Sequence, residues 1–94
     1  MPLQFYFTKH ALIEMDNDSI GLEDVKQVAL NGEVIKVYPD DKKGLSQLMF
    51  GMAGASPVHV VCSHHGETIH IITAYKPNPE LWEADFKTRK TRKS

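Results

Sequence analysis

The sequence contains a single cysteine and no long hydrophobic run. Because Cys62 is alone among 94 residues, no internal disulfide can form, and packing must hold the fold together. No apolar stretch approaches the ~20 residues that a helix needs to span a membrane. The N-terminus also lacks the basic region and apolar stretch of a secretory leader. We therefore expect a cytoplasmic protein with no membrane partner.

Metal and cofactor motifs are also missing. No glycine-rich phosphate cradle or nucleophile motif occurs. Asp40 and Asp41 are adjacent, but no further acid is spaced to complete an oxygen cage for magnesium. A zinc site that joins Cys62 to the strand histidines is disfavoured, because strand alternation sends Cys62 and His59 to opposite faces. We predict no metal and no cofactor.

The charge is divided unevenly along the chain. The formal net charge is −1, but residues 87–94 contain five lysines and arginines and no acid, so residues 1–86 hold six bases and all twelve acids. We expect a single domain over residues 1–86 and a basic tail over residues 87–94. The body should repel a phosphate backbone on average. The tail is either a polyanion-binding segment or a solvated end.

Two helices are expected in the first third of the chain. Thr8 is placed to cap a helix that runs from Lys9 to Asp16, with Ala11, Leu12 and Met15 on one face. A second helix should begin at Gly21, with Glu23 and Asp24 in its first turn, where carboxylates favour the positive end of the helix dipole. Asn31 and Gly32 predict its end, through a left-handed cap.

Short apolar segments separated by turn residues predict strands in the rest of the chain. We expect a short strand over 4–7 and four more over 34–38, 45–52, 58–63 and 68–75. This order predicts an α+β fold, with both helices on one side of a four-stranded antiparallel meander. After Pro77 and Pro79, residues 80–86 should form a short helical turn that anchors Trp82 or Leu81, with Phe86, against the sheet.

A hairpin of the last two strands would place His59 and His70 on the same face. With residues 64–65 as its loop, His59 lies opposite His70; with residues 65–66 as its loop, His59 lies opposite Ile72. The other face is more apolar and should lie beneath the helices: Val58, Val60, Cys62, Ile69 and Ile71. Cys62 is therefore expected to be a buried structural thiol.

Several motifs along the chain follow the pattern of a known family. They are Lys9-His10-Ala-Leu-Ile-Glu-Met15, Asn31-Gly32-Glu33-Val-Ile35, Tyr38-Pro39-Asp40-Asp41, Pro57-Val-His59-Val-Val61 and Ile72-Thr-Ala-Tyr75. Over nearly its whole length, the chain resembles a small bacterial domain of unknown function related to the RelE-like and BrnT-like toxins of type II toxin–antitoxin modules. The resemblance implies a RelE-like fold whose exposed sheet face acts on RNA.

The function implied by this resemblance is a metal-independent endoribonuclease that acts on mRNA, with a cognate antitoxin as protein partner. Such an enzyme needs a general base, a general acid and cations around the phosphate. His59 and His70 are the candidates for acid and base, and His10, near a helix N-terminus, is a third. The candidate phosphate ligands are Tyr75, Lys76, Lys87 and Arg89.

The alternative function is a non-catalytic interaction module. In this interpretation, the open sheet face and the basic tail bind a protein partner or a second copy of the chain, since small sheets readily add strands at their edges. His59 and His70 are then ordinary sheet residues covered by the C-terminal segment or by a partner. Trp82 is interpreted as a packing anchor, because Glu80, Glu83 and Asp85 around it would oppose a nearby phosphate.

Overall fold

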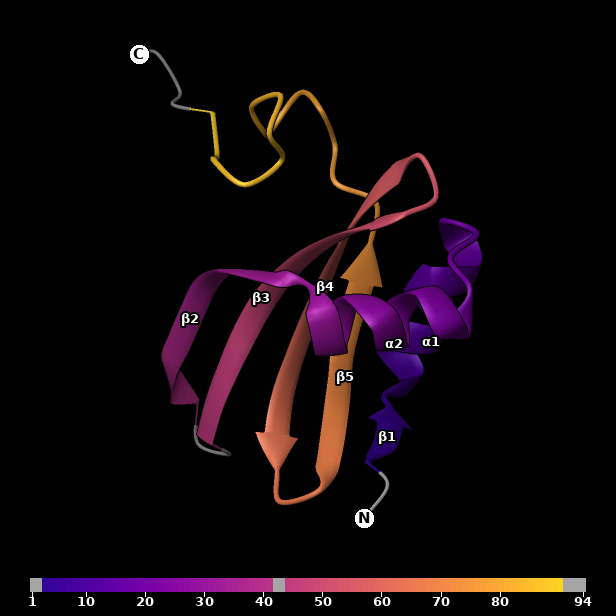
Figure 1. Cartoon of the computed structure of the whole chain (residues 1–94), viewed down its shortest axis with the longest axis vertical. Helices are drawn as coiled ribbons and strands as arrows, with labels where there is room; N and C mark the ends of the chain where they lie inside the picture. Colours follow the sequence, from indigo (N-terminus) through magenta and orange to yellow (C-terminus); the bar gives the residue numbers. More distant parts are fainter. Residues whose placement is uncertain (1–2, 42–43, 91–94) are drawn as a thin grey trace.

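The computed structural model describes residues 3–41 and 44–90 (Figure 1). Its elements, in chain order, are β1 (Gln4–Phe7), α1 (Lys9–Asn17), α2 (Leu22–Asn31), β2 (Glu33–Asp41), β3 (Gly44–Ala53), β4 (Ser56–His65) and β5 (Thr68–Tyr75). The predicted α+β class is confirmed. In the described part of the chain, neither helix is long and apolar enough to cross a membrane.

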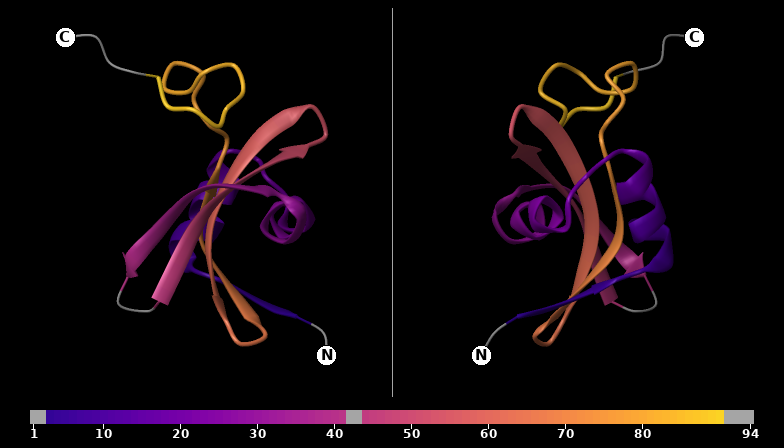
Figure 2. Two further views of the ribbon diagram at one scale, coloured as in Figure 1. Left: turned by 60° about the vertical axis from the view of Figure 1, so that its left-hand side comes forward. Right: turned by 90° about the vertical axis from the view of Figure 1, so that its right-hand side faces the viewer.

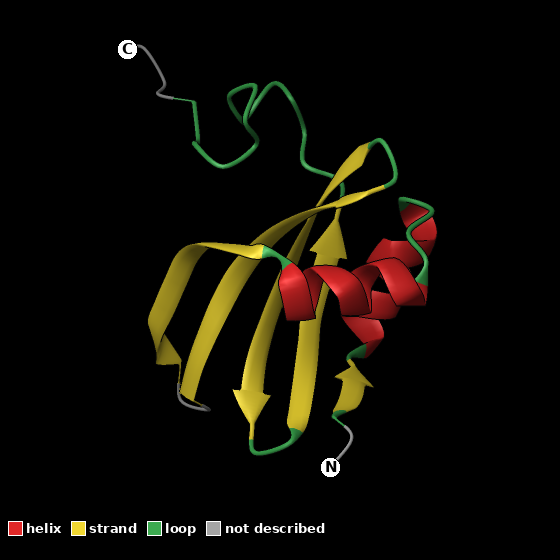
Figure 3. Cartoon of the chain, in the orientation of Figure 1, coloured by secondary structure: helices red, strands yellow, loops and turns green. Residues whose placement is uncertain are grey.

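The sheet has five strands in the order β1-β5-β4-β3-β2 (Figure 3). Strands β2 to β5 form the expected antiparallel series, but β1 adds to it in parallel beside β5, with Gln4 opposite Thr68. The sheet is therefore mixed, and the prediction of a four-stranded antiparallel sheet is corrected. Four residues are too few for their alternation to show which neighbour a strand pairs with.

The two helices cover different parts of the sheet. Helix α2 crosses one face and contacts β3 and β4, whereas α1 lies against β5 near the edge at which β1 ends (Figures 1 and 2). Thr8 fixes the start of α1: its hydroxyl accepts from the Ala11 backbone N–H at 3.0 Å and donates to the Ile72 carbonyl at 2.9 Å. The N-cap is therefore also a tie between α1 and β5.

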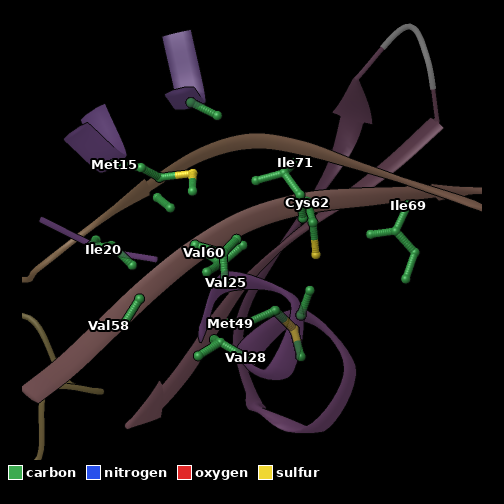
Figure 4. Packing of buried hydrophobic residues seen from close by; sticks show 13 residues of the cluster. Met15, Ile20, Val25, Val28, Met49, Val58, Val60, Cys62, Ile69 and Ile71 are labelled. Atoms are coloured by element: carbon green, nitrogen blue, oxygen red, sulfur yellow. The ribbon is translucent and has the colours of Figure 1, made fainter. Parts of the chain in front are cut away.

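The hydrophobic core joins both helices to one face of the sheet (Figure 4). The helices contribute Ala11, Met15, Val25, Val28 and Ala29, and the strands contribute Met49, Val58, Val60, Cys62, Ile69, Ile71 and Ala74. The core face predicted for β4 and β5 is thus confirmed. Burial raises the pKa of the Cys62 thiol to about 11, so this cysteine is a packing residue with little thiolate character.

Residues 77–90 form a folded loop, which we call the strap, in place of the predicted helical turn. The Asp85 carboxylate accepts from the backbone N–H groups of Lys87 and Thr88 at 2.9 and 3.1 Å. Side-chain bonds of this kind compete with helix formation. Trp82 and Arg89 then pair as an isolated antiparallel bridge. The strap lies beyond the end of β5, near the turn between β3 and β4 (Figure 1).

Gly32 ends α2 in extended backbone, so the predicted left-handed cap is wrong. Its φ is −72° and its ψ is 177°, and its N–H donates to the Val28 carbonyl at 2.8 Å. A Cβ at this position would lie 2.5 Å from the Val28 carbonyl oxygen and 2.6 Å from that of Phe50. Glycine is needed here because the end of α2 comes close to the β3 backbone.

We expect Gly32→Ala to lower the free energy of unfolding by about 1–3 kcal/mol, because both neighbouring atoms are backbone and must shift together. Gly21→Ala is the control: a Cβ added there would have the Asp24 Oδ2 as its nearest atom, at 3.5 Å, and the φ of Gly21 is −78°. Urea unfolding followed by circular dichroism measures both. Equal stability of the two variants would contradict the close-approach explanation.

Candidate functional site

The sheet face opposite the core, here called the open face, is built in rows of paired residues. The first row crosses the sheet from β2 to β5 and consists of Glu33, Phe50, His59 and Tyr75. The second row crosses from β2 to β1 and consists of Tyr38, Ser46, Ser63, His70 and Tyr6. A middle row of Lys36, Leu48, Val61 and Thr73 lies between them. The strap covers the first row, whereas the second row lies at the far end of β4.

His59 lies opposite Tyr75, and neither predicted register is correct. The turn between β4 and β5 is Gly66–Glu67, and an extra residue in β5, Ile72, shifts the register between Val61 and Cys62. His59 and His70 do share the open face, but His70 pairs with Ser63. Four residues of strand separate the two rows, or about 13 Å at ~3.3 Å per residue. The two histidines therefore cannot act on one bond together.

His59 is fully buried in an aromatic enclosure. Its ring meets three others edge-on: Trp82 at a centroid distance of 4.5 Å, Tyr75 at 5.3 Å and Phe50 at 6.0 Å. Its Nε2 lies 2.7 Å from the Phe86 carbonyl oxygen, and its Nδ1 lies 3.3 Å from the Tyr75 hydroxyl. Both ring nitrogens are thus satisfied within the protein.

These bonds assign the state of His59. A carbonyl oxygen only accepts, so Nε2 carries the proton and Nδ1 of the neutral ring accepts from the Tyr75 hydroxyl. Burial lowers the pKa of His59, although the bond to Phe86 acts in the opposite direction. Burial, together with nearby Tyr38, also raises the pKa of Tyr75, against the effect of Arg89. While the strap is in place, His59 is a neutral group that no substrate reaches.

Three of the predicted phosphate ligands lie in or beside the strap. The Lys87 Nζ is 3.1 Å from the Glu33 Oε1, and the Arg89 guanidinium lies 5.4 Å from the centre of the Trp82 ring. Lys76 follows β5, where its backbone N–H donates to the Asp18 carboxylate at 2.9 Å and its side chain is exposed. Lys87 therefore ties the strap to β2, and Arg89 packs on Trp82 within the strap. Residues 91–94 of the predicted basic tail lie outside the described residues.

Two other histidine side chains, those of His65 and His70, lie together at the other end of the open face. The rings of His65 and His70 are 4.6 Å apart, the His65 Nε2 lies 3.1 Å from the Ser63 hydroxyl, and Tyr6 lies 5.3 Å from His70. Both histidines are half-buried. Sequence reasoning missed His65 because it assigned this residue to the turn. The signal was its even spacing from His59, which puts both on one face once the strand extends to His65.

An open groove of about 580 Å³ lies over β2, β3, β4 and β5, and neither His65 nor His70 lines it. It is lined by Lys36, Val37, Tyr38, Pro39, Ser46, Val61 and Ile72. The Lys36 Nζ lies 5.3 Å from the Tyr38 ring centre, and no carboxylate of the described side chains lines the groove. The groove thus combines apolar side chains with one cation and two hydroxyl groups, those of Tyr38 and Ser46.

His10 lies apart from both histidine sites. It is exposed in the first turn of α1 and makes no hydrogen bond or ring contact with another candidate residue of the described chain. Among the side chains that the structure describes, which leave out Asp40 and Asp41, no group of three or more histidines, cysteines or acids is placed to hold a metal ion. Of the three candidate catalytic histidines, the geometry leaves His70 as the one that is accessible and has a suitable neighbour.

The fold and the two rows define a small α+β domain with a mixed sheet and one open, histidine-bearing face. The chain belongs to the DUF4258 family, a domain of unknown function, whose model matches residues 7–76. No curated protein and no solved structure matches it significantly. The match ends at Lys76, so the strap lies outside the family domain.

The lowered pKa of His59 makes stability depend on pH. The unfolded chain binds more protons than the folded one between the folded pKa and the ordinary value of 6.5, so stability is full above 6.5 and falls as the pH drops through this window. We expect urea unfolding from about pH 7 to about pH 5 to show this loss, with a slope of at most about 1.4 kcal/mol per pH unit.

His59→Gln should flatten this slope, whereas His64→Gln, at an exposed position of the same strand, should keep it. Asp85 does not interfere, because the backbone N–H groups of Lys87 and Thr88 lower its pKa from 3.8, and its contribution is lost only at lower pH. An unchanged slope in His59→Gln would show that another group causes the dependence.

Proposed function

We propose that the chain is a toxin-like, metal-independent endoribonuclease that acts on mRNA at the open face, with His65 and His70 as its acid–base pair. The observation that carries this proposal is the contact between these two rings, 4.6 Å apart, in the row that also contains Tyr38 and Ser46 of the groove. His59, which the sequence favoured for this role, is replaced by His65 because it is sealed beneath the strap.

The proposed reaction is transfer of a phosphodiester to the neighbouring 2′-hydroxyl. One imidazole takes the 2′-hydroxyl proton while the 2′-oxygen forms its bond to phosphorus, and the other imidazole, protonated, gives its proton to the 5′-oxygen as that P–O bond breaks. Imidazole changes charge between pH 5 and 8, so a pair of histidines can supply the base and the acid together at neutral pH. The products are a 2′,3′-cyclic phosphate and a 5′-hydroxyl.

Lys36 and Tyr38 are the proposed phosphate ligands, since both line the groove. The distribution of charge around the groove supports phosphate binding, although the net charge of residues 1–86 is negative. Among the described side chains, the carboxylates lie on the helices and their ends, in the β4–β5 turn, in the strap, and at Glu33, which is paired with Lys87. RNA on the middle and second rows would therefore meet Lys36 without a facing acid among the described side chains.

The motif resemblance to RelE-like and BrnT-like toxins supports the same reaction class, although fold-level similarity is only an associational argument. The family match by itself does not connect the chain to these toxins. A cognate antitoxin is accordingly a proposed partner, and the mRNA is the proposed substrate.

We expect His65→Gln and His70→Gln each to slow RNA cleavage by about 10²–10⁴-fold, the usual contribution of a general acid or base. His64→Gln is the matched control, because His64 precedes His65 on β4, faces the other side of the sheet by strand alternation and is exposed. End-labelled structured and unstructured RNAs, incubated in chelator and in magnesium, provide the assay. Chelator-resistant cleavage that survives both substitutions would contradict the assignment.

A non-catalytic interaction module is the second candidate, and the edge of the sheet favours it. Strand β2 is an edge strand, and two of its apolar residues, Val34 and Val37, are each 43% exposed. An edge strand presents unpaired backbone groups, to which another strand can add. This candidate gives the β2 edge, rather than the groove, as the functional surface.

If β2 joins a second copy of the chain, light scattering should give a mass that rises with concentration, and Val34→Lys, at a β2 residue outside the groove, should reduce that association about tenfold or more by burying a charge at the new interface. Leu12→Lys is the control, because Leu12 is 48% exposed on α1, away from β2. A constant monomer mass, or equal loss in the two variants, would count against association through this edge.

A further inference from the structure

We infer that the strap occupies a nucleobase-binding pocket formed by Phe50, His59 and Tyr75, and that RNA displaces it. This inference rests on the proposed ribonuclease function and names a subsite of it. The pocket lies in the first row of the open face. Trp82 and the Phe86 carbonyl of the strap fill it, and a base with a ring carbonyl could make the same contacts with His59.

The contacts that the strap makes are those a base would make. The Trp82 ring lies edge-on to the His59 ring at 4.5 Å and is 8% exposed, and the Phe86 carbonyl accepts from the His59 Nε2–H at 2.7 Å. A nucleobase offers the same two features, a flat ring that packs on aromatic side chains and an edge that forms hydrogen bonds.

The hydrogen bond selects the kind of base. Because the neutral His59 ring donates from Nε2, the group at the position of the Phe86 oxygen must be an acceptor without a hydrogen. Uracil, cytosine and guanine carry a carbonyl oxygen that projects from the ring, as the Phe86 oxygen projects from its backbone, whereas the acceptors of adenine are nitrogens within the ring. The pocket should therefore favour bases with a carbonyl, such as uracil, over adenine.

The strap is held in a way that permits displacement. It pairs with no strand of the sheet, and its Lys87–Glu33 ion pair is exposed, where such pairs contribute little. A hollow of about 490 Å³ lies along it, lined by Pro79, Trp82, Glu83, Ala84, Phe86 and Lys90. It also begins directly after the family domain, which ends at Lys76. The strap thus contacts the sheet mainly through Trp82, Phe86 and Lys87.

The pocket and the proposed cleavage site share one surface. His59 and Ser63 face the same way on β4, about 13 Å apart at ~3.3 Å per residue. The groove side chains Lys36 and Val61 lie in the row between them. One RNA strand could therefore place a phosphate at His70 and a base of another nucleotide at His59.

Trp82 is the only tryptophan, so its fluorescence reports the position of the strap. We would titrate the full-length His65→Gln/His70→Gln variant, which should not cleave, with oligouridine, oligoadenosine and uridine monophosphate. Oligouridine should shift the Trp82 emission to longer wavelength and raise its quenching by acrylamide several-fold, and oligoadenosine should bind about tenfold more weakly. Uridine monophosphate distinguishes a free nucleotide from an RNA chain as the ligand.

A second pair of variants tests the strap as a competitor. Trp82→Ala should tighten the binding of labelled oligouridine, followed by anisotropy, about tenfold, because a larger fraction of the pocket is then open. Leu81→Ala, at a strap residue that is 46% exposed, should leave it unchanged. Weaker binding by Trp82→Ala would overturn the inference, since Trp82 would then itself contact RNA.

RNA that binds, or is cleaved by the wild-type chain, without any change in Trp82 emission would overturn the inference and leave the ribonuclease proposal standing. Absence of both binding and cleavage for every RNA would overturn both. A shift of the emission without cleavage by the wild-type chain would support the pocket and contradict the ribonuclease.

Discussion

The extra residue in β5, Ile72, determines what the open face presents. Without it, the alternation that puts Ile69 and Ile71 in the core would continue and send Tyr75 to the core face. The bulge re-phases the strand, so that Ala74 fills the core position instead and Tyr75 lies opposite His59. The Tyr75 hydroxyl can then donate to His59, and the aromatic surface on which the strap rests is complete. One inserted residue thus connects the core, the buried histidine and the C-terminal segment.

The burial of His59 separates two histidines that alternation alone makes equivalent. A buried imidazole without partners would be costly, but both of its nitrogens are bonded, and no buried side-chain N or O atom of the described residues lacks a partner. These bonds keep the ring neutral and fixed, as suits a structural or recognition group. His70 lies in the polar second row, half-buried beside His65.

Local patterns predict the elements but not their long-range partners. The Thr8 cap, both helices, the four later strands and the core face of β4 all follow from periodicity and turn residues over a few positions. The parallel pairing of β1, the bulge at Ile72 and the path of the strap depend on contacts between distant residues, which alternation does not encode. The site shows the same division: the shared face of His59 and His70 was predictable, whereas the burial of one and the pairing of the other with His65 were not.

Charge illustrates why averages along the chain describe a site poorly. Interactions between exposed charges are largely screened beyond ~8–10 Å at physiological salt, so a ligand on the open face responds to its near neighbours. The sequence places twelve acids in the first 86 residues, yet no described carboxylate lines the groove, and Glu33, at the edge of the first row, is paired with Lys87. Lys87, in the described part of the basic segment, is therefore part of the same surface. The strap that carries it covers the aromatic side chains of the first row and offsets the charge of Glu33.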